Sequence, residues 1–130
     1  MAPCAETITN MRNLPWKSLL SWLLAAFFVV GGISNIFASG TILADYARWG
    51  YPGWFHYVTG VLELTAAALI AWRPTRLWGA GLASLVMLGA AGTVLSHGEF
   101  SHAIAPLLVL SVALTTAFFA YRGHCPADLN

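Results

Sequence analysis

Four long blocks of apolar residues dominate the chain, and most polar residues lie in the short segments between them. No Asp, Glu, Lys or Arg occurs in residues 18–44, 77–96 or 101–121, and a single acidic residue, Glu63, interrupts the apolar residues 54–72. At about 1.5 Å per residue, a helix of about 20 residues crosses a hydrocarbon core of about 30 Å. The pattern therefore predicts four membrane-spanning helices over residues 16–39, 54–72, 77–95 and 103–121.

The segment between the first two predicted spans has a different pattern. Ile42, Tyr46 and Trp49 recur at helical spacing with charged residues between them, and a Gly and a Pro follow. This arrangement is typical of a short helix lying in the membrane interface, with its aromatic side chains at headgroup level. The predicted fold is therefore all-α: a four-transmembrane-helix bundle with a short interfacial helix between the first and second spans. Residues 1–15 are predicted to form a flexible tail and residues 122–130 a short one.

The third span is rich in small residues. Gly79 with Ala83, and Gly89 with Thr93, are four positions apart and therefore lie on one face of a helix. Pairs of this kind favour close packing between membrane helices.

Composition and charge agree with a membrane protein. The chain of 130 residues is 58% hydrophobic and 8% charged, whereas a soluble domain carries about a quarter charged residues. A net charge of +1 gives no reason to expect nucleic acid as a partner. Of the Lys and Arg residues, all but Arg48 lie before or at the start of the first span, between the second and third, or after the fourth. The positive-inside rule then places both termini in the cytoplasm, most simply of a bacterial-type cytoplasmic membrane.

Glu63 is the most unusual residue of the chain. An ionisable group near the bilayer centre is costly to insert, so it marks either a functional site or a buried polar pairing. On a helix it shares one face with His56, Thr59 and Gly60. We expect this face to point into the bundle, where Glu63 is either a protonated acid that ties two helices together or a proton donor or acceptor in a lipophilic pocket.

Other polar residues are candidates for a site around Glu63. His56 is either an assisting catalytic residue or a histidine whose hydrogen bonds only stabilise the structure. Thr59, Gly60, Trp54 and His97 are the candidates for contact with a substrate.

A second candidate site lies on the predicted outer loop. His97, Glu99 and His102 form an H-x-E-x-x-H sequence, and imidazole and carboxylate groups can hold zinc or another transition metal. The spacing matches no recognised metal motif, and polar residues are common where a loop faces water. We treat a metal site here as the weaker alternative.

From about residue 16 to residue 121 the sequence resembles the DoxX-like family of small four-helix membrane proteins. The resemblance rests on GGISNIF (31–37), ARWGYP (47–52), TGVLELTAAALI (59–70) and TRLWGAGLASLVMLGAAGTVL (75–95), in this order and at this spacing. It implies a four-helix bundle associated with quinone- or thiol-linked oxidoreductase systems, often as an accessory subunit.

The sequence departs from the family pattern at Asn35, because family members usually have a basic residue there. An amide cannot neutralise a carboxylate, so burial favours the protonated form of Glu63. We therefore expect a neutral Glu63 hydrogen-bonded to Asn35, which makes Asn35 the third candidate catalytic residue beside Glu63 and His56.

Three functional hypotheses follow. The first is a membrane partner of a redox system that meets a quinone or another lipophilic carrier near Glu63. The second is a small membrane enzyme (isomerase, cyclase or hydrolase) that uses Glu63 for acid–base chemistry on an apolar substrate. The third is a non-catalytic assembly or transport element. Beside the lipid bilayer, the expected partners are a membrane or redox protein and further copies of the chain, since four helices make a narrow bundle.

Overall fold

The computed structural model describes residues 15–123, and within this range every regular element is a helix. The elements are α2 (Pro15–Ile36), α3 (Gly40–Arg48), α4 (Phe55–Ala71), the 3-10 turn η1 (Arg73–Thr75), α5 (Arg76–Ser96) and α6 (Phe100–Gly123). The all-α prediction is confirmed, and each predicted span coincides with a helix to within about one turn. The predicted tails lie almost wholly outside the described residues.

Three of these helices are long and apolar enough to cross a membrane. They are Trp16–Ile36, Arg73–Ser96 and Phe100–Arg122, whereas α4 is equally apolar but shorter, at 17 residues. Length and composition alone therefore support three spans, one fewer than the sequence pattern predicted.

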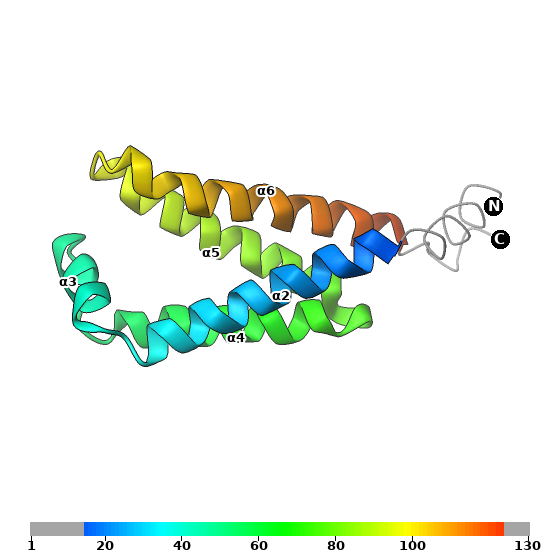
Figure 1. Ribbon diagram of the computed structural model, residues 1–130, viewed down its shortest axis with the longest axis horizontal. Coiled ribbons are helices and arrows are strands. Elements are labelled where there is room, and N and C mark those ends of the chain that lie inside the picture. The colour runs from blue at the N-terminus through cyan, green and yellow to red at the C-terminus, as the bar shows by residue number, and fades with distance from the viewer. Residues whose placement is uncertain (1–14, 124–130) are drawn as a thin grey trace.

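The long helices pack as two pairs. α2 crosses α4, α5 runs alongside α6, and α4 contacts α5 while α2 contacts α6. In Figure 1 the two pairs lie closest where α4 leads through η1 into α5, and they spread apart toward the end where α3 lies. The bundle is therefore wedge-shaped, with α3 at its wide end.

Small side chains fill the interior, and large apolar side chains cover the outside. Phe28 and Ile70 are the only large side chains that are fully buried in the described part of the chain, and the rest of the core is mostly alanine. Leu, Phe, Trp and Val side chains are instead exposed along every long helix. This distribution is expected in a bilayer, because lipid tails are as apolar as leucine and small residues let helices approach closely.

Two glycines make the crossing of α2 and α4 possible. A Cβ atom added to Gly60 would lie 2.8 Å from the carbonyl oxygen of Gly32, and one added to Gly32 would lie 2.9 Å from the carbonyl oxygen of Gly60. Neither backbone could accept a side chain there without moving. Gly60, a candidate for substrate contact, is thus a packing residue at this crossing.

The glycines of α5 divide into two kinds. Gly79 packs against α4, since an added Cβ would lie 2.6 Å from the amide nitrogen of Ile70, as the spacing predicted. Gly89 does not pack against another helix of residues 15–123: outside its own turn of α5, no described heavy atom lies within 4 Å of its Cβ position, and the same is true of Gly81. The prediction that Gly89 mediates close packing is therefore wrong among the described residues, because Gly89 borders a cavity between α4 and α5 instead.

The basic residues gather at the narrow end of the wedge. Lys17 opens α2, Arg73 and Arg76 lie between α4 and α5, and Arg122 closes α6, whereas Arg48 lies at the opposite end on α3. Within residues 15–123 the charge asymmetry seen along the sequence is therefore also an asymmetry in space.

The glycine crossing predicts a difference between otherwise similar substitutions. Gly60→Ala forces a methyl group against the backbone of α2 and should lower the free energy of unfolding by about 1–3 kcal/mol. Gly81→Ala places the same methyl group in open space and should cause no loss. Unfolding of both variants by SDS titration in mixed micelles measures the difference. Equal stability of the two variants would contradict the close contact.

Candidate functional site

Asn35, in the last turn of α2, joins three helices. Its Nδ2 donates a hydrogen bond to Oε2 of Glu63 on α4 (2.7 Å) and a second to the carbonyl oxygen of Gly31 (3.2 Å). Its Oδ1 accepts from the hydroxyl of Tyr46 on α3 (3.0 Å). The backbone carbonyl of the same residue accepts from Nδ1 of His56 (2.7 Å). The amide and carbonyl of one residue thus fix the relative positions of α2, α3 and α4.

His56 donates a hydrogen bond to a backbone carbonyl group at the C-terminal end of α2. The last four carbonyl groups of a helix have no partner within the helix, and His56 is buried beside this end of α2. Because a carbonyl can only accept, Nδ1 carries a proton in this contact. His56 is not among the residues that line the cavity described below. The structure therefore places this candidate catalytic residue behind Asn35, where it holds Asn35 in position.

Glu63 is buried against the glycine-rich end of α2. A Cβ atom added to Gly31 would lie 3.2 Å from Oε1 and 3.3 Å from Oε2, so the absence of a side chain at Gly31 makes room for the carboxyl group. The hydrogen bond to Asn35 that the sequence predicted is present, and it uses Oε2. Among residues 15–123, no group hydrogen-bonds to the other oxygen, Oε1.

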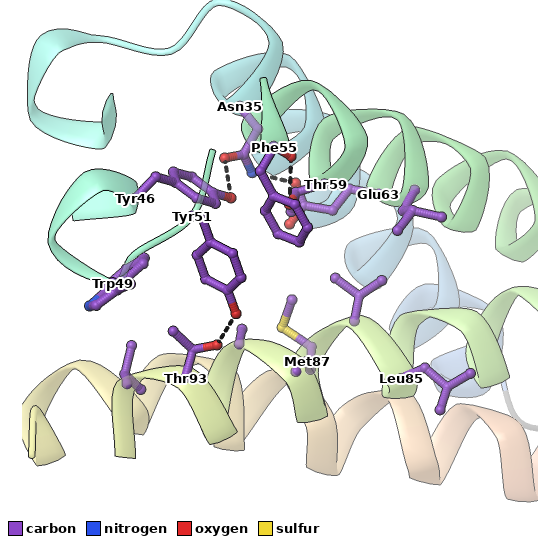
Figure 2. Close-up of a pocket in the computed structure, with 15 residues that line it drawn as sticks. Asn35, Tyr46, Trp49, Tyr51, Phe55, Thr59, Glu63, Leu85, Met87 and Thr93 are labelled. Carbon is purple, nitrogen blue, oxygen red and sulfur yellow. Dashed lines mark hydrogen bonds between the residues drawn. The ribbon is translucent and has the colours of Figure 1, made fainter. Parts of the chain in front are cut away.

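A cavity of about 340 Å³ lies beside Glu63, between α4 and α5 at the wide end of the wedge. Figure 2 shows Thr59 and Glu63 on one side, Met87 and Leu85 on the other, and the aromatic residues of α3 and the following loop at one end. The lining residues are Asn35, Tyr46, Trp49, Tyr51, Phe55, Thr59, Leu62, Glu63, Leu85, Val86, Met87, Gly89, Ala90, Thr93 and Val94. The cavity thus has a polar side formed by α2 and α4 and an apolar side formed by α5.

Aromatic side chains close the end of the cavity nearest α3. Tyr51 stacks on Phe55 with ring centroids 4.3 Å apart, and Tyr46 lies edge-on to Trp49 and Tyr51 at 5.8 and 6.0 Å. The hydroxyl groups of Tyr51 and Thr93 form a hydrogen bond of 2.6 Å that reaches α5. We call Tyr46, Trp49, Tyr51 and Phe55 the aromatic cap. Burial raises the pKa of Tyr46, so its hydroxyl remains a hydrogen-bond donor to Asn35.

This role of the aromatic residues was not predicted from the sequence. Tyr46 and Trp49 lie on one face of a short amphipathic helix, a pattern that indicates the membrane interface. In the structure that face is turned onto the cavity, and both residues are partly buried. The pattern did contain the signal that α3 has an apolar side, but it could not show whether lipid or protein covers that side.

A charged cluster fastens α3 to the turn between α5 and α6. Arg48 donates from Nε to Oε1 of Glu99 (2.8 Å) and from a terminal nitrogen to Oε2 (3.1 Å). Nε1 of Trp49 also donates to Glu99 (3.3 Å), and Nδ1 of His102 contacts Oε2 at 2.8 Å. Arg48 and His102 together lower the pKa of Glu99 to about 2. We call the contacts of Glu99 with Arg48 and Trp49 the latch.

The structure does not assemble the metal site considered from the sequence. His97 directs Nδ1 to the carbonyl oxygen of Thr93 (2.9 Å), while both oxygens of Glu99 are used by Arg48. Within residues 15–123, no three His, Cys, Asp or Glu side chains are grouped so that they could hold a metal ion. The carboxylate that a metal would need is neutralised by a guanidinium group instead.

The remaining candidates for substrate contact are found in different places. Thr59 lines the cavity one helical turn from Glu63. Trp54, at the start of α4, is 60% exposed and lies outside the cavity, as does His97. Of the residues named from the sequence, Asn35, Thr59 and Glu63 therefore share the cavity.

The family model of the DoxX-like family matches residues 19–118, which include every residue that lines the cavity. The chain belongs to the DoxX-like family. No curated protein and no solved structure matches it. Together with its long apolar helices, the family assignment identifies this DoxX-like chain as an integral membrane protein.

The latch of this DoxX-like protein predicts a pH dependence. Because the pKa of Glu99 is lowered from 4.5 to about 2 in the folded protein, its stabilising contribution is present above pH 4.5 and is lost as the pH falls toward 2. Amide hydrogen exchange over residues 40–52 should therefore quicken between pH 4.5 and 2, after correction for the intrinsic pH dependence of exchange.

Substitution of Arg48 should have the same effect at neutral pH. Arg48→Gln removes the guanidinium group that donates to both oxygens of Glu99. It should quicken amide hydrogen exchange over residues 40–52. Asp45→Asn is the matched control, because Asp45 contacts the same guanidinium at 2.8 Å without reaching Glu99. If both variants exchange like the wild type, the latch does not hold α3 in place.

Proposed function

We propose that this DoxX-like protein binds a lipophilic molecule with a carbonyl-bearing head, such as a quinone, in the cavity beside Glu63. In this proposal it serves as the membrane partner of a redox system. The position of Glu63 is the main support for a binding site. Glu63 is a buried acid that lines a largely apolar cavity, and one of its oxygens has no hydrogen-bond partner among the described residues. The redox partner is proposed from the family resemblance.

The hydrogen bonds around Glu63 suit a neutral acid that donates to the ligand. An isolated buried carboxylate is strongly unfavourable, and no Lys, Arg or His of residues 15–123 forms an ion pair with Glu63. Asn35 donates to Oε2, so Oε2 takes the part of the acid's carbonyl oxygen and Oε1 that of its hydroxyl. A ligand carbonyl or ether oxygen would accept from Oε1.

The cavity has the size and the walls for a ring-shaped head. About 340 Å³ lies at the lower end of the range of about 300–1,000 Å³ for small-molecule pockets. Tyr51 and Phe55 present stacked aromatic rings at one end, and offset stacking on such rings is favourable for a flat ligand. Val86 and Met87 supply an apolar wall.

The same group supports a second candidate function. A carboxylic acid with an unengaged oxygen in a mostly apolar cavity is also what acid–base catalysis on an apolar substrate requires. Thr59 and Tyr46 bring hydroxyl groups to the cavity lining that would orient such a substrate. The two functions differ in whether Glu63 must transfer its proton or only share it.

We further propose that α4 also crosses the membrane, so that the chain has four spans and both termini in the cytoplasm. Seventeen helical residues extend about 26 Å, close to the hydrocarbon thickness. Trp54 and Trp72 flank α4 and are exposed, as is typical of residues that anchor a span at both interfaces. The basic residues at the narrow end support this orientation by the positive-inside rule.

Ligand retention should distinguish Glu63→Met from the wild type and from Glu63→Gln. Native mass spectrometry in nanodiscs formed from host membranes should find a lipophile on the wild type. Glu63→Met, which is similar in length but cannot hydrogen-bond, should lower its occupancy at limiting ligand, with affinity reduced by about tenfold or more. Glu63→Gln keeps an acceptor for Asn35 and offers an amide donor in place of the hydroxyl, so it should retain the ligand within a few-fold of the wild type.

The control and the outcomes separate the two functions. Glu99→Gln, outside the cavity, should leave occupancy unchanged. Conversion of the bound molecule by the isolated wild type, abolished in Glu63→Gln without loss of binding, would favour the enzyme. Equal occupancy in the wild type and Glu63→Met, or no lipophile on the wild type, would contradict the proposed site.

The topology is tested by labelling single cysteines in a background of Cys4→Ser and Cys125→Ser. A membrane-impermeant maleimide should label Arg73→Cys from the cytoplasmic side and His97→Cys from the opposite side. Labelling of both from the same side would contradict the proposed orientation of α5.

A further inference from the structure

The wall of the cavity between α4 and α5 is incomplete. Leu62 on α4 and Leu85 on α5 both line the cavity and are 38% and 67% exposed. Gly89, one turn further along α5, also lines the cavity and is exposed, and no described atom outside its own turn of α5 lies within 4 Å of its Cβ position. The cavity wall between α4 and α5 therefore includes two exposed leucine side chains and an exposed glycine.

The end of the cavity nearest α3 is closed by more contacts than the wall between α4 and α5. The aromatic cap covers it, the hydrogen bond between Tyr51 and Thr93 spans from the cap to α5, and the latch binds α3 to the turn between α5 and α6. A molecule arriving from water would have to break these contacts. A molecule dissolved in the bilayer would only have to displace the leucine side chains.

We propose that the cavity is filled sideways from the bilayer, through an opening between α4 and α5 bordered by Leu62, Leu85 and Gly89. Its ligand is an amphiphile dissolved in the membrane, with a hydrogen-bond-accepting head and an apolar chain. This inference rests on the proposed function in taking the cavity as a ligand site, but the route is a separate property of the wall. The head lies beside Glu63 and the chain leaves through the opening into lipid.

The arrangement of polar groups fixes this orientation of the ligand. Glu63 and Asn35 lie on the side of the cavity formed by α4 and α2, whereas the border of the opening is apolar. A chain that remains in lipid keeps an apolar environment throughout entry, so only the head must be desolvated. Gly89 acts as a specificity-determining residue in this account, because any larger side chain there would narrow the path of the chain.

The route is tested by the rate at which a cysteine inside the cavity reacts. Thr59→Cys, on the wall opposite Gly89, is the reporter, with Cys4→Ser and Cys125→Ser as background and the protein in liposomes. The probes are decyl methanethiosulfonate, which dissolves in the bilayer, and the charged trimethylammonium-ethyl methanethiosulfonate, which does not. Both carry the same reactive group, and labelling in SDS normalises the rates.

The structure offers a matched pair of variants on the same helix. Gly89→Leu and Gly81→Leu place the same side chain at two exposed positions of α5 that are open to 4 Å, but only Gly89 lines the cavity. Decyl methanethiosulfonate should label the reporter about tenfold faster than the charged reagent, and Gly89→Leu should slow it by about tenfold. Gly81→Leu should leave the rate unchanged.

Two results would overturn the proposal: labelling by the charged reagent at the rate of the decyl reagent, or equal decyl rates in Gly89→Leu and Gly81→Leu. The assay needs no bound ligand, so it fails or succeeds separately from the proposed function. Failure of the proposed binding site would appear as equal occupancy of the wild type and Glu63→Met in the mass spectra, whereas failure of the lateral route would appear only in the labelling rates.

Discussion

The hydrogen bond between Asn35 and Glu63 is the contact on which the rest of this structure depends. A buried carboxyl group needs a partner, because an unsatisfied polar group in an apolar environment costs several kcal/mol. Asn35 supplies that partner from α2 at 2.7 Å, and its other polar atoms are held by Tyr46 and His56. One buried acid and its amide partner therefore connect three helices, and the second oxygen of the acid has no hydrogen-bond partner among the described residues.

The shape of the bundle follows from where small residues lie. Gly32 and Gly60 bring α2 and α4 into backbone contact, and Gly79 does the same between α5 and α4 near the narrow end. Toward α3, Gly89 on α5 has no side chain to fill the space between α5 and α4, and the cavity beside Glu63 lies there. Close packing at one end and a gap at the other are what create a cavity in a bundle too small to enclose one by size alone.

Polar residues at the wide end connect α3 to the turn between α5 and α6. Glu99 neutralises Arg48 and accepts from Trp49, so the turn between α5 and α6 is attached to α3. Arg48 and Glu99 lie at the end of the bundle opposite the other described basic residues, and the side chain of Arg48 is partly exposed there. Hydrogen bonds and an ion pair therefore hold the end of the cavity nearest α3, whereas apolar side chains form its wall between α4 and α5. The two boundaries differ in chemistry.

The sequence by itself determined the helices and their environment. Apolar length and the rarity of charge depend only on local composition and helical period, and they predicted the long helices. The pairing of Glu63 with Asn35 was expected from the resemblance to the DoxX-like pattern, from which Asn35 departs. Only the tertiary structure decided which surface each helix buries. Periodicity gave α3 an apolar side but could not show that Tyr46 and Trp49 cover a cavity, nor that Gly60 packs while Gly89 lies open. Those outcomes depend on contacts between segments distant in the chain, and the same pattern of small and apolar residues suits lipid and protein equally well.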